Sequence, residues 1–201
     1  MRVLVACEFS GVVRRAFRAK GHDAWSCDLL SAEDGSPYHI QCNVEYVLDP
    51  KPDDTYYRGP KWDLMIAHPP CTHLAVSGAR WFKEKGKIIQ DAALAFVQML
   101  MDAPVPRIAI ENPISIISTR IRKPDQVIHP WQFGHGEVKA TCLWLKNLPL
   151  LVPTSIVDGS HARVHRAPPS AHRWKDRSRT YSGIAEAMAE QWADGSEWRL
   201  R

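Results

Sequence analysis

Two stretches of the sequence carry side chains suited to nucleophilic and acid–base chemistry. His-Pro-Pro-Cys at 68–71 follows an apolar run, and its prolines fix the backbone that presents Cys71. A thiolate held in this way could attack an electrophilic carbon, although most free cysteines are small buried hydrophobes. Glu111 ends the apolar run 108–110, so we expect partial desolvation to raise its pKa and to suit it to proton exchange with a heterocycle. The alternative role for Glu111 is to cap a helix that begins near Pro113.

A third stretch has the features of a nucleoside site. Phe-Ser-Gly at 9–11 forms a turn in which Gly11 lets the backbone approach a ligand closely. Asp28 ends the next strand, where an acid can accept two hydrogen bonds from a ribose diol. The same aspartate could simply cap a turn. The pattern is not Gly-x-Gly-x-x-Gly, so the sequence does not favour a dinucleotide.

The elements that position these residues alternate between strand and helix. This alternation predicts parallel strands joined by helical crossovers, and hence an α/β enzyme whose ligands bind at the carboxyl ends of its strands. The reactive residues fall repeatedly at those ends. The sequence predicts strands at 2–6, 24–27, 39–44, 62–67, 107–110 and 142–145, and helices at 12–20, 88–101 and 183–192.

Composition and charge narrow the class of protein. The 201 residues are 45% hydrophobic and 24% charged, which is typical of a folded globular chain, and no apolar run is long enough to span a bilayer. Five scattered cysteines without a Cys-x-x-Cys pair favour free thiols in a reducing cytoplasm. The net charge of +4 is uneven, because residues 161–179 hold six basic residues against one acid. This stretch is either a solvated loop or a segment that contacts phosphates.

These motifs, in this order and on these strands, resemble the DNA (cytosine-5)-methyltransferase family. The resemblance covers residues 2–145 and 180–192. Matching stretches are Cys-Glu-Phe-Ser-Gly at 7–11 (the family's cofactor loop), Pro-Pro-Cys at 69–71 (its nucleophile motif), Ser77-Gly78 (its catalytic loop), Glu-Asn-Pro at 111–113 (its Glu-Asn-Val motif) and 181–192 (its closing motif).

The resemblance implies a fold, a reaction and a cofactor. The fold is the doubly wound, mostly parallel, Rossmann-like sheet of class I S-adenosylmethionine-dependent methyltransferases, as a single domain over residues 1–201. The reaction is methyl transfer to C5 of cytosine in DNA through a covalent adduct at Cys71, with Glu111 and Asn112 also catalytic and the target base flipped out of the duplex. S-adenosylmethionine is expected at Phe9, Ser10, Gly11, Asp28, Asn43, Pro70 and Ser182. No metal and no membrane contact are expected.

The substrate side departs most from the family's pattern. Lys139-Ala140-Thr141 stands where the family has an Arg-x-Arg pair, and Val12-Val13 replaces a glycine of the cofactor loop. Only about 35 residues separate the strand predicted at 142–145 from the closing motif, so the short basic segment 155–180 takes the place of a target-recognition domain, as in minimal enzymes of phages and prophages. Candidate substrate contacts are Pro69, Ser77, Lys139, Thr141, Arg163, Arg166, Arg173 and Arg177.

Two other functions remain open at this point. The missing arginine pair and recognition domain are compatible with a nucleic-acid-binding protein that keeps the fold without turnover. The short chain is also compatible with a pyrimidine methyltransferase that acts on RNA or on free nucleotides. Methyl transfer separates the first alternative from an enzyme, and the choice of substrate separates the second. A zinc deaminase is disfavoured, because His135-Gly136-Glu137 and Pro70-Cys71 occur in the wrong order.

Overall fold

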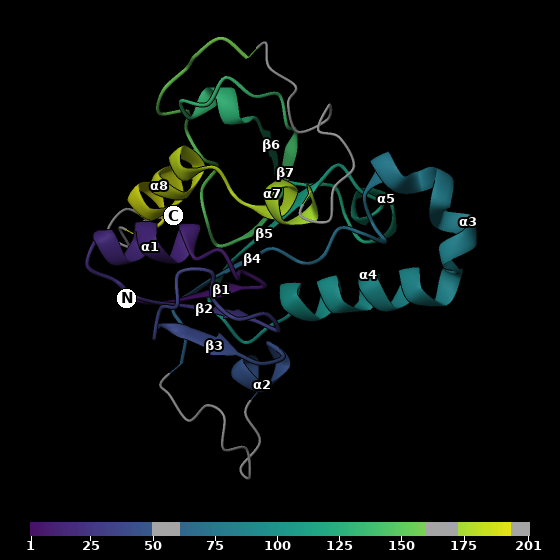
Figure 1. Cartoon of the computed structure of the whole chain (residues 1–201), viewed down its shortest axis with the longest axis horizontal. Coiled ribbons are helices and arrows are strands. Elements are labelled where there is room, and N and C mark those ends of the chain that lie inside the picture. The colour runs from purple at the N-terminus through teal and green to yellow at the C-terminus, as the bar shows by residue number, and fades with distance from the viewer. Residues whose placement is uncertain (50–60, 160–172, 194–201) are drawn as a thin grey trace.

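Seven strands form one mixed sheet in the computed structural model, which describes residues 1–49, 61–159 and 173–193. The sheet order is β3-β2-β1-β4-β5-β7-β6 (Figure 1). The strands from β3 to β5 run parallel, and β7 is antiparallel to both of its neighbours. The strands are β1 Arg2–Ala6, β2 Asp23–Asp28, β3 His39–Gln41, β4 Leu64–Ala67, β5 Arg107–Pro113, β6 Gln126–Ile128 and β7 Thr141–Lys146.

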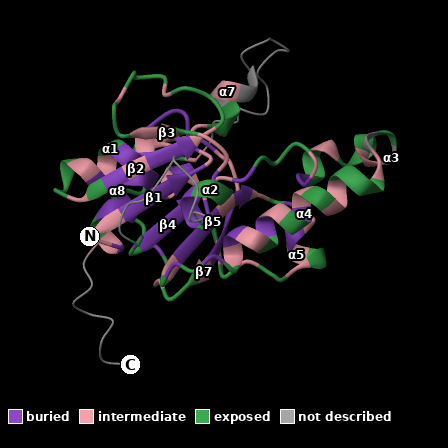
Figure 2. Ribbon diagram, turned by 90° about the horizontal axis from the view of Figure 1, so that it is seen from below, coloured by how far each residue is buried: buried purple, intermediate pink, exposed green. Residues whose placement is uncertain are grey.

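Helices cover both faces of this sheet. The α-helices are α1 Val12–Ala19, α2 Glu45–Leu48, α3 Phe82–Lys85, α4 Lys87–Met101, α5 Ile117–Arg120, α7 Arg173–Ser178 and α8 Ser182–Gln191, and two 3-10 helices are η1 Val76–Trp81 and η2 Pro130–Gln132. Helices α1 and α8 pack side by side on one face, and α4 extends from the other (Figures 1 and 2).

Alternation along β1 explains the two cores. Val3 and Val5 join the apolar cluster that contains Phe17 of α1 and Met188 of α8. Leu4, one residue on, joins the cluster that contains Val97 of α4. Successive side chains of a strand point to opposite faces, so a strand buried on both faces is apolar throughout. Figure 2 shows this sheet as the buried centre of the molecule.

The predicted α/β architecture is confirmed, with three local differences. The strand predicted at 39–44 ends at Gln41, because the Asn43 side chain accepts a hydrogen bond from the Glu45 amide and a short helix begins there. The strand predicted at 62–67 begins at Leu64. Strand β6 and the helices of six residues or fewer were not predicted, because such segments are too short to show a periodicity.

Candidate active site

Four candidate site residues directly follow four residues that are paired side by side across the sheet. Ala6 of β1 is paired in register with Cys27 of β2 and with Ala67 of β4, and Ala67 is paired with Ile110 of β5. The next residues along these strands are Cys7, Asp28, His68 and Glu111. The chain crosses from one half of the sheet to the other between β1 and β4, which is where open α/β sheets bind ligands.

Glu8 precedes α1, and its side chain caps the first turn of that helix. Its side chain is buried, and its Oε1 and Oε2 atoms accept hydrogen bonds from the amides of Val13 at 2.7 Å and Arg14 at 3.3 Å. Burial raises the pKa of this carboxyl, while His68 and the two amides oppose that rise. Helix N-termini bind phosphates through these free amides. In this protein the amides of Val13 and Arg14 already donate hydrogen bonds to the carboxyl group of Glu8.

Gly11 has a packing role as well as a turn role. Its φ of +68° favours glycine, and a Cβ there would lie 2.3 Å from Nη2 of Arg14. The Arg14 side chain is buried, donating to Ser26 Oγ at 2.9 Å and pairing with Asp34 at 2.5 Å. The buried guanidinium therefore covers this glycine and fixes the turn to β2.

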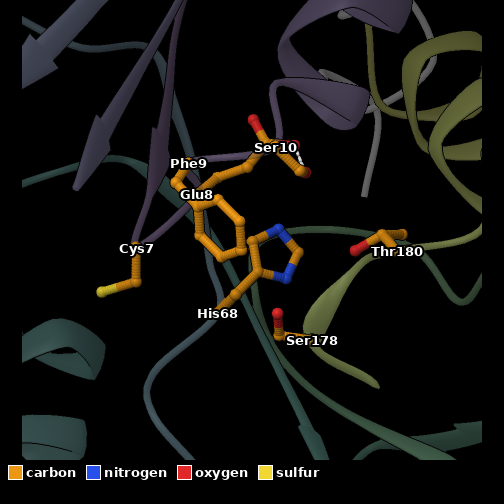
Figure 3. A pocket seen from close by; sticks show the side chains of 7 residues that line it. All are labelled: Cys7, Glu8, Phe9, Ser10, His68, Ser178 and Thr180. Carbon is orange, nitrogen blue, oxygen red and sulfur yellow. Dashed lines mark hydrogen bonds between the residues drawn. The ribbon is translucent and has the colours of Figure 1, made fainter. Parts of the chain in front are cut away.

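A small, partly open hollow lies between the β1 turn and the segment before α8. Figure 3 shows the His68 ring in its centre, between the Phe9–Ser10 turn and Thr180. Of the predicted cofactor residues, Phe9 and Ser10 line this hollow. The full lining is Cys7, Glu8, Phe9, Ser10, His68, Ser178 and Thr180.

The other predicted cofactor residues lie around this edge without lining the hollow. Asp28 is half-buried, and its Oδ1 caps a turn by accepting the Leu30 amide at 2.9 Å. Burial raises the pKa of Asp28, and burial together with Asp28 raises the pKa of Cys7 to about 12. Asn43 bonds locally to Glu45, Pro70 is exposed, and Ser182 lies 3.4 Å from His135 Nε2 at the start of α8.

Glu111 forms an ion pair that the sequence did not predict. Its Oε2 lies 2.8 Å from His68 Nδ1 and accepts a hydrogen bond from Thr180 Oγ1 at 3.0 Å. The prediction of a raised Glu111 pKa was wrong. Burial raises it, but His68, Lys139 and Thr180 together outweigh burial, and the pKa falls to about 2. Glu111 is bound to His68 rather than to a helix end.

Asn112 ties the two reactive loops together. Its buried Nδ2 donates to the Pro69 carbonyl at 2.8 Å, so the end of β5 holds the Pro-Pro segment in place. Cys71 is exposed and is absent from the lining of the hollow. Its carbonyl accepts the amides of Leu74 and Ala75, which turns the chain back toward β5. Through its bond to Pro69, Asn112 orients the loop that carries Cys71.

The predicted substrate contacts are spread around this edge. Pro69 is buried, Ser77 is exposed on η1, and the buried Thr141 hydroxyl donates to the Lys139 carbonyl at 3.3 Å. Lys139 Nζ donates to the carbonyl of Arg177, whose side chain is exposed. Arg163 and Arg166 lie outside the described residues, as does the side chain of Arg173, the first residue of α7.

Three residues of the site were missed by sequence reasoning. Glu8 precedes a helix start, where acids are favoured, so its role could have been inferred. His68 occupies the strand-end position next to Cys71, and the register with Glu111 would have brought the two together. Thr180 gave no signal, because it reaches Glu111 from a segment 69 residues away.

The described residues also bear on metal binding and on membrane insertion. Within residues 1–49, 61–159 and 173–193, no group of three His, Cys, Asp or Glu side chains could hold a metal ion. Over the same residues, no helix has both the length and the apolar character needed to cross a bilayer.

Comparisons with known proteins found similarity in structure but none in sequence. No protein-family model and no curated protein sequence matches the chain. Among solved structures, it is similar to an E. coli protein described as a candidate DNA modification methyltransferase encoded within a prophage. The TM-score is 0.53 at 12% identity, over 79% of this chain and 52% of that chain. This chain thus spans about half the length of that protein, and the likeness shows a shared fold.

Proposed function

We propose that this protein is a DNA (cytosine-5)-methyltransferase with a doubly wound class I fold that uses S-adenosylmethionine. The observation that carries the proposal is the joining of two loops at the carboxyl edge of the sheet. Asn112 holds Pro69, and His68 holds Glu111, each at 2.8 Å. These contacts bring the segment with the candidate nucleophile next to the segment with the candidate base-binding acid. The DNA modification described for the E. coli neighbour supports the same substrate class.

The cofactor fits the chemistry of the β1 turn. Glu8 already occupies the first amides of α1, which disfavours a nucleotide phosphate there. S-adenosylmethionine carries no phosphate, and its sulfonium is a cation, so a buried acid at this place is compatible with it. Phe9, Ser10, Gly11 and Asp28 would hold the nucleoside, with Asp28 accepting the ribose hydroxyls. Asn43, Pro70 and Ser182 complete the proposed cofactor residues. When bound, the cofactor supplies an electrophilic methyl group.

The proposed chemistry assigns separate tasks to Cys71 and Glu111. The thiolate of Cys71 forms a bond to C6 of the pyrimidine, and the electron pair displaced from the C5–C6 double bond makes C5 nucleophilic. Glu111, as a carboxylate, accepts a hydrogen bond from the exocyclic amine and from N3 once N3 has taken a proton from solvent, and so stabilises positive charge on the ring. After methylation, loss of the C5 proton to solvent expels the thiolate and restores the double bond. Asn112 and Pro69 keep the nucleophile loop against β5 throughout.

The proposed partner is duplex DNA with a flipped cytosine. Lys139 lies near Glu111 and donates a hydrogen bond to the carbonyl of Arg177, an exposed residue of α7. Together with Ser77 and Thr141, these two residues belong to the described part of the proposed DNA contact. Arg163, Arg166 and Arg173 extend the proposal along the basic segment. Positive side chains contact phosphates, which position a duplex without reading its sequence. We therefore expect a short target of about one to three base pairs, read mostly around the flipped base.

Methyl transfer from labelled S-adenosylmethionine tests the proposal. The substrate panel is cytosine-containing duplex DNA, the same sequence as RNA, and free cytidine nucleotides, each with Glu111→Gln as the inactive control. Label at C5 of cytosine in DNA supports the proposal. Label only in RNA or nucleotides moves the activity to a different substrate, and cofactor binding without transfer to any of them identifies a non-catalytic binder.

A further inference from the structure

His68 lies between two buried carboxylates. Its Nδ1 is 2.8 Å from Glu111 Oε2, and it shares the lining of the hollow with Glu8 (Figure 3). The side chains of His68 and Glu111 are 11% and 10% exposed, so solvent screens their charges weakly. His68 Nε2 is buried and has no hydrogen-bond partner among the described residues. The imidazole thus pairs with the end of β5 and lies beside the turn after β1.

The charges around His68 come from four elements. Glu8 follows β1, Asp28 ends β2, Glu111 lies in β5, and Lys139 precedes β7. Burial and Lys139 disfavour the protonated ring, but the two glutamates outweigh them and raise the pKa of His68. The carboxylate at Nδ1 requires a proton on that nitrogen, since carboxylates only accept hydrogen bonds. The geometry therefore places a proton on Nδ1, and the surrounding charge favours the doubly protonated ring.

The hydrogen bonds of Glu111 are unevenly divided between its two oxygens. Oε2 takes both His68 and Thr180, whereas Oε1 accepts nothing from the described residues. When Oε2 of the carboxylate is held by these two hydrogen bonds, Oε1 is left free to accept a hydrogen bond from a ligand and cannot donate one. Such a group binds an amine and rejects a carbonyl at the same place.

We propose that His68 is a positioning residue that holds Glu111 as a fixed anion and thereby makes the site select pyrimidines with an exocyclic amine. The inference rests on the proposed function and deepens it, because cytosine carries that amine and uracil carries a carbonyl. Replacing His68 by glutamine keeps an N–H donor and removes the charge. Burial would then dominate at Glu111, and its carboxyl would protonate more readily.

The first test measures the protonation of the Glu111 carboxyl directly and does not depend on enzymatic activity. Glutamate labelled with carbon-13 at its side-chain carboxyl is followed by NMR from about pH 8 to about pH 1, with the signal assigned by its loss in Glu111→Gln. His68→Gln should move the midpoint upward by at least about one pH unit. Thr180→Val, which removes the other hydrogen bond to Oε2 without removing a charge, is the matched control. An unchanged midpoint in His68→Gln, or an equal shift in Thr180→Val, overturns the proposal.

Two measurements keep the result independent of the variant's folding and of the proposed function. In the wild type, the nitrogen-15 spectrum of His68 should show both ring nitrogens protonated at neutral pH, and a neutral ring overturns the proposal. Methyl transfer to duplexes with cytosine or uracil at the target should show a preference for cytosine that drops at least about tenfold in His68→Gln and persists in Thr180→Val. If the wild type binds cofactor and transfers no methyl, the proposed function fails, and the two NMR results still decide the role of His68.

Discussion

Two parts of the active edge are built in opposite ways. The inner network, Glu8, His68, Glu111 and Thr180, is buried or nearly buried, and its carboxylates are bonded to amides, an imidazole and a hydroxyl. The outer loop, residues 70–81, presents Cys71, Ser77 and Trp81 to solvent and is anchored by the buried Leu74. Under the proposed function, the charges of the inner network are positioned before a substrate binds, and the proposed nucleophile Cys71 stays exposed for the substrate to cover.

The sharpest way to test this contrast is to remove one group from the outer loop. Cys71→Ser should lower methyl transfer by a factor on the order of 10³ or more, because the nucleophile is lost. The melting temperature should stay within about 2 °C of wild type, because an exposed side chain makes few packing contacts. Cys42→Ala, a half-buried thiol outside the site, is the control and should keep its activity. Full activity in Cys71→Ser would contradict the division of roles.

Breaking the inner network should instead change stability, and in a pH-dependent way. The pKa of Glu111 falls from its ordinary 4.5 to about 2 in the folded chain. A carboxyl of this kind stabilises the fold above its unfolded pKa, and that stabilisation is lost as the pH falls through its folded pKa. Glu111→Gln should therefore cost about 3 kcal/mol of unfolding free energy near neutral pH and progressively less between about pH 4.5 and pH 2.

Urea unfolding at a series of pH values measures this difference. The exposed Glu186→Gln on α8 serves as the control and should change the unfolding free energy by less than about 0.5 kcal/mol. A Glu111→Gln variant as stable as wild type at every pH would show that the charged Glu111 carboxylate does not stabilise the fold.

Asp28 lies between the two extremes, since it is half-buried and already bonded to the Leu30 amide. Asp28→Ala should weaken binding of S-adenosylhomocysteine by about 1.5–3 kcal/mol through the loss of charge-assisted ribose contacts. Calorimetry measures the loss, and Asp28→Asn should recover part of it. Equal affinities in wild type and both variants would leave Asp28 with its turn-capping role alone.

The smallest effect is expected at the exposed Arg177. Arg177→Ala should leave the fold unchanged and reduce the slope of log affinity for DNA against log salt concentration by about one. Lys20 follows the last residue of α1, at the opposite edge of the sheet, so Lys20→Ala is the control and should keep the wild-type slope. The slopes come from fluorescence titrations at several salt concentrations. Equal slopes in wild type and Arg177→Ala would remove this residue from the proposed DNA contact.

The same contrast explains which helices, strands and site contacts could be predicted from the sequence. Strands such as 2–6 and the helix 88–101 were predictable, because their burial imposes an apolar run or a helical period. The placement of Asp28 and Glu111 at one edge followed from the parallel order. The His68–Glu111 pair did not, since it depends on the register between β4 and β5 and on Thr180 arriving from the far end of the chain. Its charge reversed the pKa expected from burial alone.

Covalent trapping tests the central claim most directly. A duplex with 5-fluorocytosine at the target, incubated with S-adenosylmethionine, should form a stable adduct with the protein, because fluorine cannot leave C5 as a proton. Peptide mass spectrometry should place the adduct on Cys71, and Cys71→Ser should form none. An adduct on another residue, or no adduct in a sample that methylates ordinary cytosine, would contradict the account.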